Sequence, residues 1–146
     1  MDTDETASIL ASIPGGNELL NWFGKKPDFG DAEVLSLNLN RDGPSTLCVG
    51  VSKPVKSSHQ AVIVTFTLCD MIDIALEGFG RQNVIEGLTI RGATKRSIHK
   101  SLVGIGNHLP DHVLELEPCA GAFGRIHATV ANISLEISAT AMRWQK

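Results

Sequence analysis

The sequence has few aromatic residues and little net charge. It contains no tyrosine and two tryptophans, and aromatic residues make up 5% of its 146 positions. Aromatic rings are the surfaces on which sugars and single-stranded bases most often stack. The formal net charge is −3, from 13 basic and 16 acidic residues, whereas generic binding to a polyanion requires a basic surface. We therefore expect no nucleic-acid partner.

Long hydrophobic runs and paired cysteine motifs are also missing. The sequence has no run of about eighteen apolar residues, the length needed to cross a membrane. Its first ten residues, MDTDETASIL, are acidic where a secretory signal peptide begins with basic residues. The cysteines are odd in number and form no Cys-x-x-Cys pair: Cys48, Cys69 and Cys119. We predict a cytoplasmic protein with reduced cysteines and no membrane partner.

The length and composition predict a single domain over residues 1–146. A chain of this length, with 42% hydrophobic residues, buries about two-thirds of its extended surface on folding. That burial is enough for one hydrophobic core. No internal repeat and no low-complexity linker divides the sequence.

The N-terminal part, residues 1–30, is predicted to form a helical and loop-like cap. Apolar residues between positions 19 and 23 follow helical spacing, with Asn17 as the expected N-cap and Gly24 as the expected end of the helix. Proline and glycine in the next six residues predict a loop, which would return Phe29 to the core.

Residues 31–146 follow a different period. Apolar and polar residues alternate with a period of two, which is typical of half-buried strands. The alternating segments cover residues 35–39, 47–51, 62–68, 72–76, 88–90, 114–116 and 126–137. No strand alternates regularly with a helix. The sequence therefore predicts a mainly β domain, an antiparallel sheet or sandwich of about seven or eight strands with a short N-terminal helical cap.

Turns and irregularities refine this pattern. Asp42, Gly43 and Pro44 predict the turn of a hairpin. The inward-facing side chains change from even to odd positions around residues 131–132, which predicts a β-bulge in one long strand. Residues 94–106 are compatible with either a helix or a loop.

The segment from Leu47 to Val51 has the character of an edge strand. Lys53 and Pro54 follow it, as residues that protect an exposed edge often do. An edge strand can pair across a twofold axis. The sequence is therefore compatible with either a homodimer or a monomer.

Candidate catalytic groups are sparse. The segment His108-Leu-Pro-Asp111-His112 has the spacing of a helical metal site, but Pro110 disfavours that helix and no third ligand is evident. Nucleophile elbows and phosphate-binding loops are missing from the sequence. We predict no catalytic residues, no metal and no cofactor, and hence a protein that is not an enzyme.

Acidic residues concentrate near the N-terminus. Residues 1–42 hold eight acidic and three basic residues, a charge of −5, whereas residues 81–100 hold five basic and one acidic residue, a charge of +4. Asp28, Asp31 and Glu33 lie closest together. They can cap a turn through Asx hydrogen bonds, present a negative patch to a partner, or act as a catalytic or metal-binding group.

Three short motifs occur in a recognisable order. They are Trp22-Phe23-Gly24, the stretch Pro27-x-Phe29-x-Asp31-Ala32-Glu33-Val34, and Gln82-Asn83-Val84-Ile85. Over residues 19–90 the chain resembles immunity protein family 50 of bacterial polymorphic toxin systems. It departs from that pattern at Gly30, where such proteins commonly carry histidine. The resemblance implies a small cytosolic protein without catalytic activity that protects its producer by binding a cognate toxin.

The resemblance and the charge pattern together suggest where such a partner would bind. We predict a partner-binding surface formed by Asp28, Asp31, Glu33 and Asp42. The alternative is a β-barrel or sandwich that binds a small ligand in a cavity lined by Val64, Phe66 and Ile90. A metal-assisted hydrolase using His108, Asp111 and His112 is the third hypothesis.

Overall fold

The computed structural model describes residues 5–24, 26–40, 42–55, 58–78, 83–93, 110–118 and 122–137. Two short helices come first, and strands make up most of the remainder. The elements are α1 (Thr6–Ala11), α2 (Gly16–Phe23), β1 (Ala32–Asn38), β2 (Ser45–Val55), β3 (Ser58–Glu77), β4 (Val84–Gly92), β5 (His112–Pro118) and β6 (Phe123–Ile137). No helix in these ranges is long and apolar enough to span a membrane.

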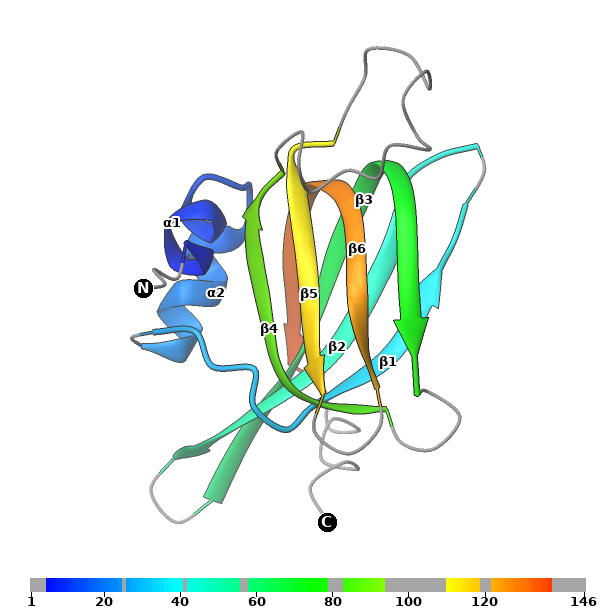
Figure 1. Ribbon diagram of the computed structural model, residues 1–146. Coiled ribbons are helices and arrows are strands. Elements are labelled where there is room, and N and C mark those ends of the chain that lie inside the picture. Colours follow the sequence, from blue (N-terminus) through cyan, green and yellow to red (C-terminus); the bar gives the residue numbers. More distant parts are fainter. Residues whose placement is uncertain are drawn as a thin grey trace.

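The strands form one antiparallel sheet that closes into a barrel in the order β1-β2-β3-β6-β5-β4 (Figure 1). The predicted fold class, mainly β with an N-terminal helical cap, is therefore confirmed. Closure depends on a short ladder, because β1 and β4 pair only through Ala32 with Ile85 and Glu33 with Val84.

The strand number is smaller than predicted, with six strands among the described residues. Segments 62–68 and 72–76 belong to the single twenty-residue strand β3. Asp70 adopts a left-handed conformation there, with φ of 52°, and two extra residues separate Cys69 from Asp73 in the ladder with β6. An alternation pattern cannot distinguish such a bend from a true break, since both interrupt it.

The predicted bulge in the last strand is confirmed. Thr67 pairs with Asn132 and Leu68 pairs with Val130, so Ala131 is the extra residue of β6. β3 and β6 both bend and pass between two layers of a flattened barrel (Figure 1). One layer holds β4, β5 and the halves of β3 and β6 that pair through residues 73–77; the other holds β1, β2 and the remaining halves.

The helical cap matches the prediction in part. Gly24 ends α2 in a left-handed conformation, and Phe29 is buried. Asn17 is not the N-cap, because α2 begins at Gly16 and its N-cap is Gly15, with φ of 88°. A left-handed cap favours glycine over asparagine, and Gly15 also lies against the backbone of Ile133.

The edge-strand interpretation of residues 47–51 is wrong. The stretch from Leu47 to Val51 is paired on one side with β1 and on the other with β3, so it is not an edge. The homodimer remains a prediction, but this stretch cannot form its interface. Lys53 lies beyond the pairing with β1, where β2 pairs only with β3 among the described residues. Its ammonium group lies 4.5 Å from the Trp22 ring centroid and donates a hydrogen bond to the Trp22 carbonyl.

The alternation in β1 also differs from the prediction. A register shift between Val34 and Ser36 turns Val34 into the core and leaves Leu35 exposed. The predicted cavity residues Val64, Phe66 and Ile90 are buried in the hydrophobic core, where the Phe66 ring lies 6.4 Å from that of Phe29. Side chains fill the space that a ligand would need at this point.

The N-terminal segment covers one side of the barrel, where β4 and the end of β6 have no neighbouring strand among the described residues. Thr6 Oγ1 accepts a hydrogen bond from Ile90 N (3.1 Å) and donates one to Ile90 O (3.4 Å). On the β6 side, Ile133 N donates to Pro14 O (2.9 Å). Leu10 and Leu19 fill the space between.

Candidate binding cleft

Although the sheet closes into a barrel, β1 and the second half of β3 are not paired with each other on the side opposite the helices. Pairing between β2 and β3 ends at Ser45 and Leu68, so among the described residues positions 73–77 of β3 pair only with β6. β1 separates from β4 after Val34, whose backbone nitrogen donates to Asn83 O (2.8 Å). Two strand edges therefore flank this opening.

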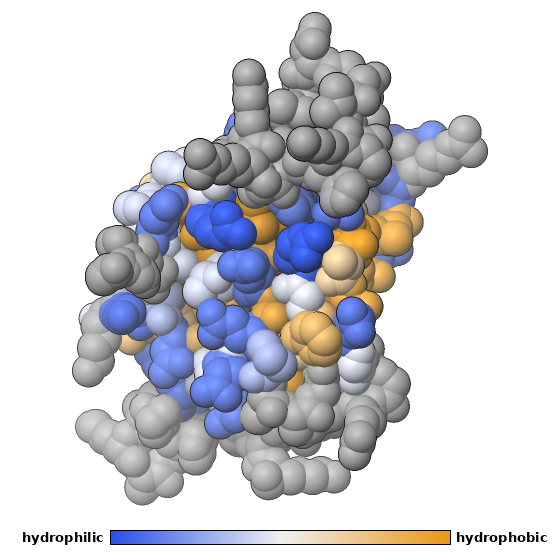
Figure 2. All heavy atoms as spheres, viewed as in Figure 1, coloured by the Kyte–Doolittle hydropathy of each residue, from blue (hydrophilic) through white to orange (hydrophobic). Residues whose placement is uncertain are grey.

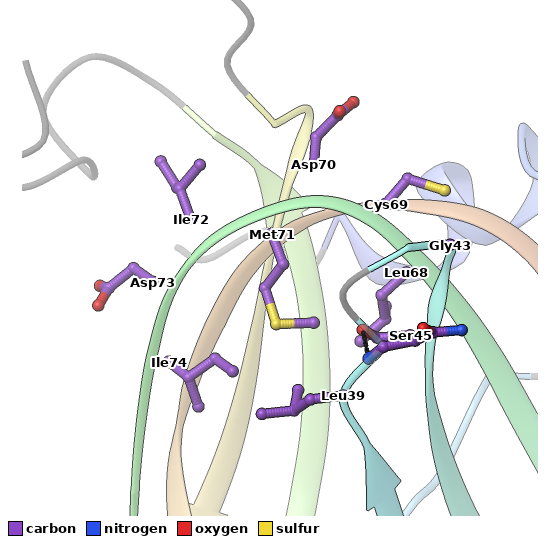
Figure 3. Close-up of a pocket in the computed structure, with 11 residues that line it drawn as sticks. Leu39, Gly43, Ser45, Leu68, Cys69, Asp70, Met71, Ile72, Asp73 and Ile74 are labelled. Atoms are coloured by element: carbon purple, nitrogen blue, oxygen red, sulfur yellow. Dashed lines mark hydrogen bonds between the residues drawn. The ribbon is translucent and has the colours of Figure 1, made fainter. Parts of the chain in front are cut away.

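A cleft of about 630 Å³ occupies the upper part of the opening, between the turn after β1 and the bend of β3 (Figure 3). Its lining comes from both elements: Leu39, Asn40, Gly43, Ser45, Leu68, Cys69, Asp70, Met71, Ile72, Asp73 and Ile74. The turn is held by two hydrogen bonds, from Asn40 N to Ser45 Oγ (3.0 Å) and from Asp42 N to Asn40 Oδ1 (3.2 Å).

The lining of the cleft is mixed, with apolar side chains beside polar ones. Figure 3 shows Leu39, Met71 and Ile74 facing the same space from opposite sides. Leu39 is 60% exposed, while Met71 and Ile74 are partly buried and pack against the core. Figure 2 shows hydrophobic residues gathered on this side of the molecule, where β1 and the second half of β3 lie in Figure 1. Exposed apolar surface of this kind is typical of binding sites.

Among the described residues, the charged side chains that line the cleft are acidic. Asp70 and Asp73 are the charged residues in its described lining. Asp42 is exposed in the turn, between Asn40 and Gly43, which both line the cleft. The lining carboxylates therefore come from β3, and the turn on the other side of the cleft holds Asp42.

Asp73 also faces the outer surface of the barrel. Its Oδ2 lies 3.8 Å from Arg125 Nε and 3.4 Å from His127 Nδ1. His127 is 1% exposed, and neither ring nitrogen has a hydrogen-bond partner in the part of the chain that the structure describes. Arg91 and Glu115 form a further ion pair on the same surface, at 3.4 Å.

A second, smaller cleft of about 250 Å³ lies farther along the same opening. Its surface is mostly apolar, and β1 and β3 both contribute residues to its lining. The lining residues are Val34, Leu35, Ser36, Leu37, Leu47, Leu76, Asn83 and Leu116.

The four predicted partner-binding residues do not form one cluster. Asp28, Asp31 and Glu33 lie at the start of β1, whereas Asp42 follows its other end. A seven-residue strand spans about 20 Å. Asp42 lies instead in the turn whose residues Asn40 and Gly43 line the same cleft as Asp70 and Asp73.

The first acidic group has a local structural role. Asp28 Oδ1 accepts a hydrogen bond from Gly30 N (2.9 Å), which confirms the turn-capping interpretation. Asp31 is exposed and adopts a left-handed conformation with φ of 62°. Glu33 is half-buried in β1, between Gly50 and Val84.

Asp70 and Asp73 were not predicted as site residues. Their signal in the sequence is the interruption of alternation at positions 70–73, where two carboxylates flank Met71 and Ile72. The sequence does not show in which direction the strand bends at this interruption. It therefore does not indicate which surface of the molecule the two carboxylates face.

The metal hypothesis receives no support from the residues around His112. His108 lies outside the described residues. His112 Nδ1 accepts a hydrogen bond from Val130 N (3.0 Å), and Asp111 N donates to Thr129 Oγ1 (2.9 Å). Burial lowers the pKa of His112, and the nearby Asp111 charge opposes this in part. No group of three or more potential metal ligands occurs in the described ranges.

Comparison with known proteins provides no relative. No family model, no curated protein and no solved structure matches the chain.

Proposed function

We propose that this chain is a cytoplasmic, non-catalytic immunity protein that binds a cognate toxin and neutralises it. The order of the Trp22-Phe23-Gly24 and Gln82-Asn83-Val84-Ile85 motifs motivates the identity of the partner. The structural support is the cleft between β1 and β3, because its mixture of apolar and acidic side chains is suited to recognition of another protein.

The rim charges suit a partner with a basic surface. Asp42 and Asp73 stand on opposite elements around the cleft. Opposite charges at a protein interface mainly raise the association rate and the specificity. A specific complex buries about 1,600 Å² in total, so the partner would also cover surface beyond the cleft.

The direct test is coexpression with the protein encoded by the neighbouring reading frame. We expect the unmodified chain to restore growth of cells that produce this protein and to bind it in vitro. Asp42→Asn should weaken binding several-fold. Asp28→Asn is the matched control, because asparagine preserves the Asx turn at that position.

Absence of both rescue and binding by the unmodified chain would contradict the proposed function. Equal weakening by the two substitutions would instead show that the acidic group at the start of β1 contributes, as the sequence alone suggested.

A small apolar ligand is the second candidate. The 250 Å³ cleft favours it, because the core residues Leu47 and Leu116 reach that space. Its volume lies just below the range of about 300–1,000 Å³ that is usual for ligand sites. Native mass spectrometry of the purified protein should then show an added mass that disappears on denaturation. A spectrum of the bare chain would contradict this candidate.

A further inference from the structure

The covered side of the barrel shows how a segment fills a gap between two strand edges of this fold. On that side, residues 5–19 lie between β4 and β6. Polar groups of the segment bond to the backbone of both edges: Thr6 to Ile90, Glu5 Oε1 to Gly92 N (3.3 Å), and Pro14 O to Ile133 N. Apolar side chains of the same segment enter the core.

The side of the barrel opposite the helices also has two strand edges and apolar side chains between them. Among the described residues, no segment covers this gap. β1 and the second half of β3 provide two strand edges. Leu37, Met71, Ile74 and Leu76 are partly buried and extend the core into the gap. Figure 1 shows the two strands on the side away from α1 and α2.

We propose that this gap accepts an extended segment of the partner protein, which adds as a strand along the edge of β3 at residues 71–76. This inference rests on the proposed function and specifies how the partner is held. Backbone groups of β3 would pair with the segment, and its alternate side chains would enter the cleft. An unpaired strand edge is a ready template for such pairing.

The chemistry of the segment follows from the lining. Leu39, Met71 and Ile74 favour apolar side chains at every second position, because successive residues of a strand face opposite sides. The negative charge of Asp73 in the lining, and of Asp42 in the bordering turn, favours a lysine or arginine in the segment, although Asp73 also lies 3.8 Å from Arg125. The expected ligand is therefore an extended peptide that alternates apolar residues and carries at least one basic residue.

A library of short linear peptides displayed on phage tests this inference without the natural partner. The full chain is the target, and a Leu39→Glu variant is used to remove peptides that bind elsewhere. Leu39 is 60% exposed, so the substitution places a charge in the cleft without disturbing the core. Ile137→Glu is the matched control, since Ile137 is 74% exposed at the end of β6.

We expect selected peptides to be basic and alternating. Their affinity should fall about tenfold or more, or about 1.4 kcal/mol, with Leu39→Glu and stay unchanged with Ile137→Glu. Hydrogen exchange should slow at residues 71–76 when the peptide binds, because strand addition protects backbone amides. Failure to select any peptide sensitive to Leu39→Glu, or protection confined to other segments, would overturn the inference.

The toxin itself then separates the two proposals. If it binds the unmodified chain and competes with the peptide, both proposals are supported. If it binds the unmodified chain and the Leu39→Glu variant equally, the proposed function stands and the strand-addition inference fails. If it does not bind at all, the proposed function fails, and the peptide selection alone decides whether the cleft accepts a strand.

Discussion

Gly15 and Gly24 flank α2 in the same left-handed conformation but in different surroundings. Their φ angles are 88° and 82°. A Cβ atom at Gly15 would lie 1.7 Å from Ile133 O, whereas one at Gly24 would meet nothing within 4 Å. Both glycines therefore adopt a backbone conformation that favours glycine. Of the two, Gly15 also approaches β6 closely.

This pair predicts two different stabilities. Gly24→Ala should lower the free energy of unfolding by about 1 kcal/mol, the cost of placing alanine in a left-handed conformation. Gly15→Ala should cost about 3 kcal/mol or more, because the helix must also move away from Ile133. Chemical denaturation of both variants measures the difference. Equal losses would show that the contact between Gly15 and β6 contributes nothing.

His112 links the start of β5 to the bulge of β6. Its Nδ1 must be unprotonated to accept the hydrogen bond from Val130 N. Burial lowers the pKa of His112 below its usual value of 6.5 in the folded protein. The unfolded chain therefore binds a proton more readily than the folded protein between this lowered pKa and 6.5.

The free energy of unfolding should consequently decrease as the pH falls from 6.5 towards the lowered pKa, and His112 should cost nothing above 6.5. The slope from one histidine is less than about 1.4 kcal/mol per pH unit, and partial exposure reduces it further. His112→Asn keeps an acceptor and removes the titration. Denaturation curves at several pH values should be flatter for this variant; identical pH dependence would refute the assignment.

At the scale of elements, α1 protects an edge of the barrel. β4 leaves β1 after two paired residues, so its remaining backbone groups need other partners. The Thr6 hydroxyl bonds to both Ile90 N and Ile90 O. A six-residue helix has little stability of its own, and these contacts help to hold it in place.

Thr6→Val tests this role, because valine has nearly the same shape and lacks the hydroxyl. Its loss leaves buried backbone groups of Ile90 without their partner, which should cost about 1–3 kcal/mol. Thr6→Ser retains the hydroxyl and should cost less. Hydrogen exchange at Ile90 should accelerate in the valine variant and not in the serine variant. Unchanged exchange in both would exclude an edge-protecting role.

The bent strands have a different consequence. The extra residues in β3 and β6 let both strands serve two layers, so few strands enclose the core. The same bend carries residues 73–77 of β3 away from β2 and leaves the gap beside β1. The candidate cleft is therefore a direct consequence of how the barrel curves.

For the molecule as a whole, charge distribution matters more than net charge. The formal charge of −3 is small, yet Asp70 and Asp73 line one cleft and Asp42 lies in the turn that borders it. Exposed charges act over about 8–10 Å at moderate salt. Such a rim should therefore influence a partner during approach more than a uniform charge of −3.

Association with the proposed toxin partner should consequently become slower as salt concentration rises. Asp42→Asn should reduce this salt dependence, while dissociation should change less, because charges at the rim act mainly on the association rate. Stopped-flow or surface-based kinetics at several salt concentrations measure both rates. A salt-independent association rate would contradict electrostatic steering by the cleft.

Local physical chemistry in the sequence was sufficient for much of the fold. Alternation predicted the strands, Gly24 predicted the end of α2, and the change of parity predicted the bulge at Ala131. Each of these depends on which face a side chain occupies or on a backbone conformation that glycine favours. Neighbouring residues alone decide such features.

Only the tertiary structure decided which distant segments meet. The turn that holds Asp42 borders the same cleft as Asp70 and Asp73, because β3 bends at Asp70 and returns beside this turn. Alternation specifies inward and outward faces, but it contains neither the order of strands nor the direction of a bend. The N-terminal segment covers one gap between strand edges for the same reason, and the opposite gap presents the cleft.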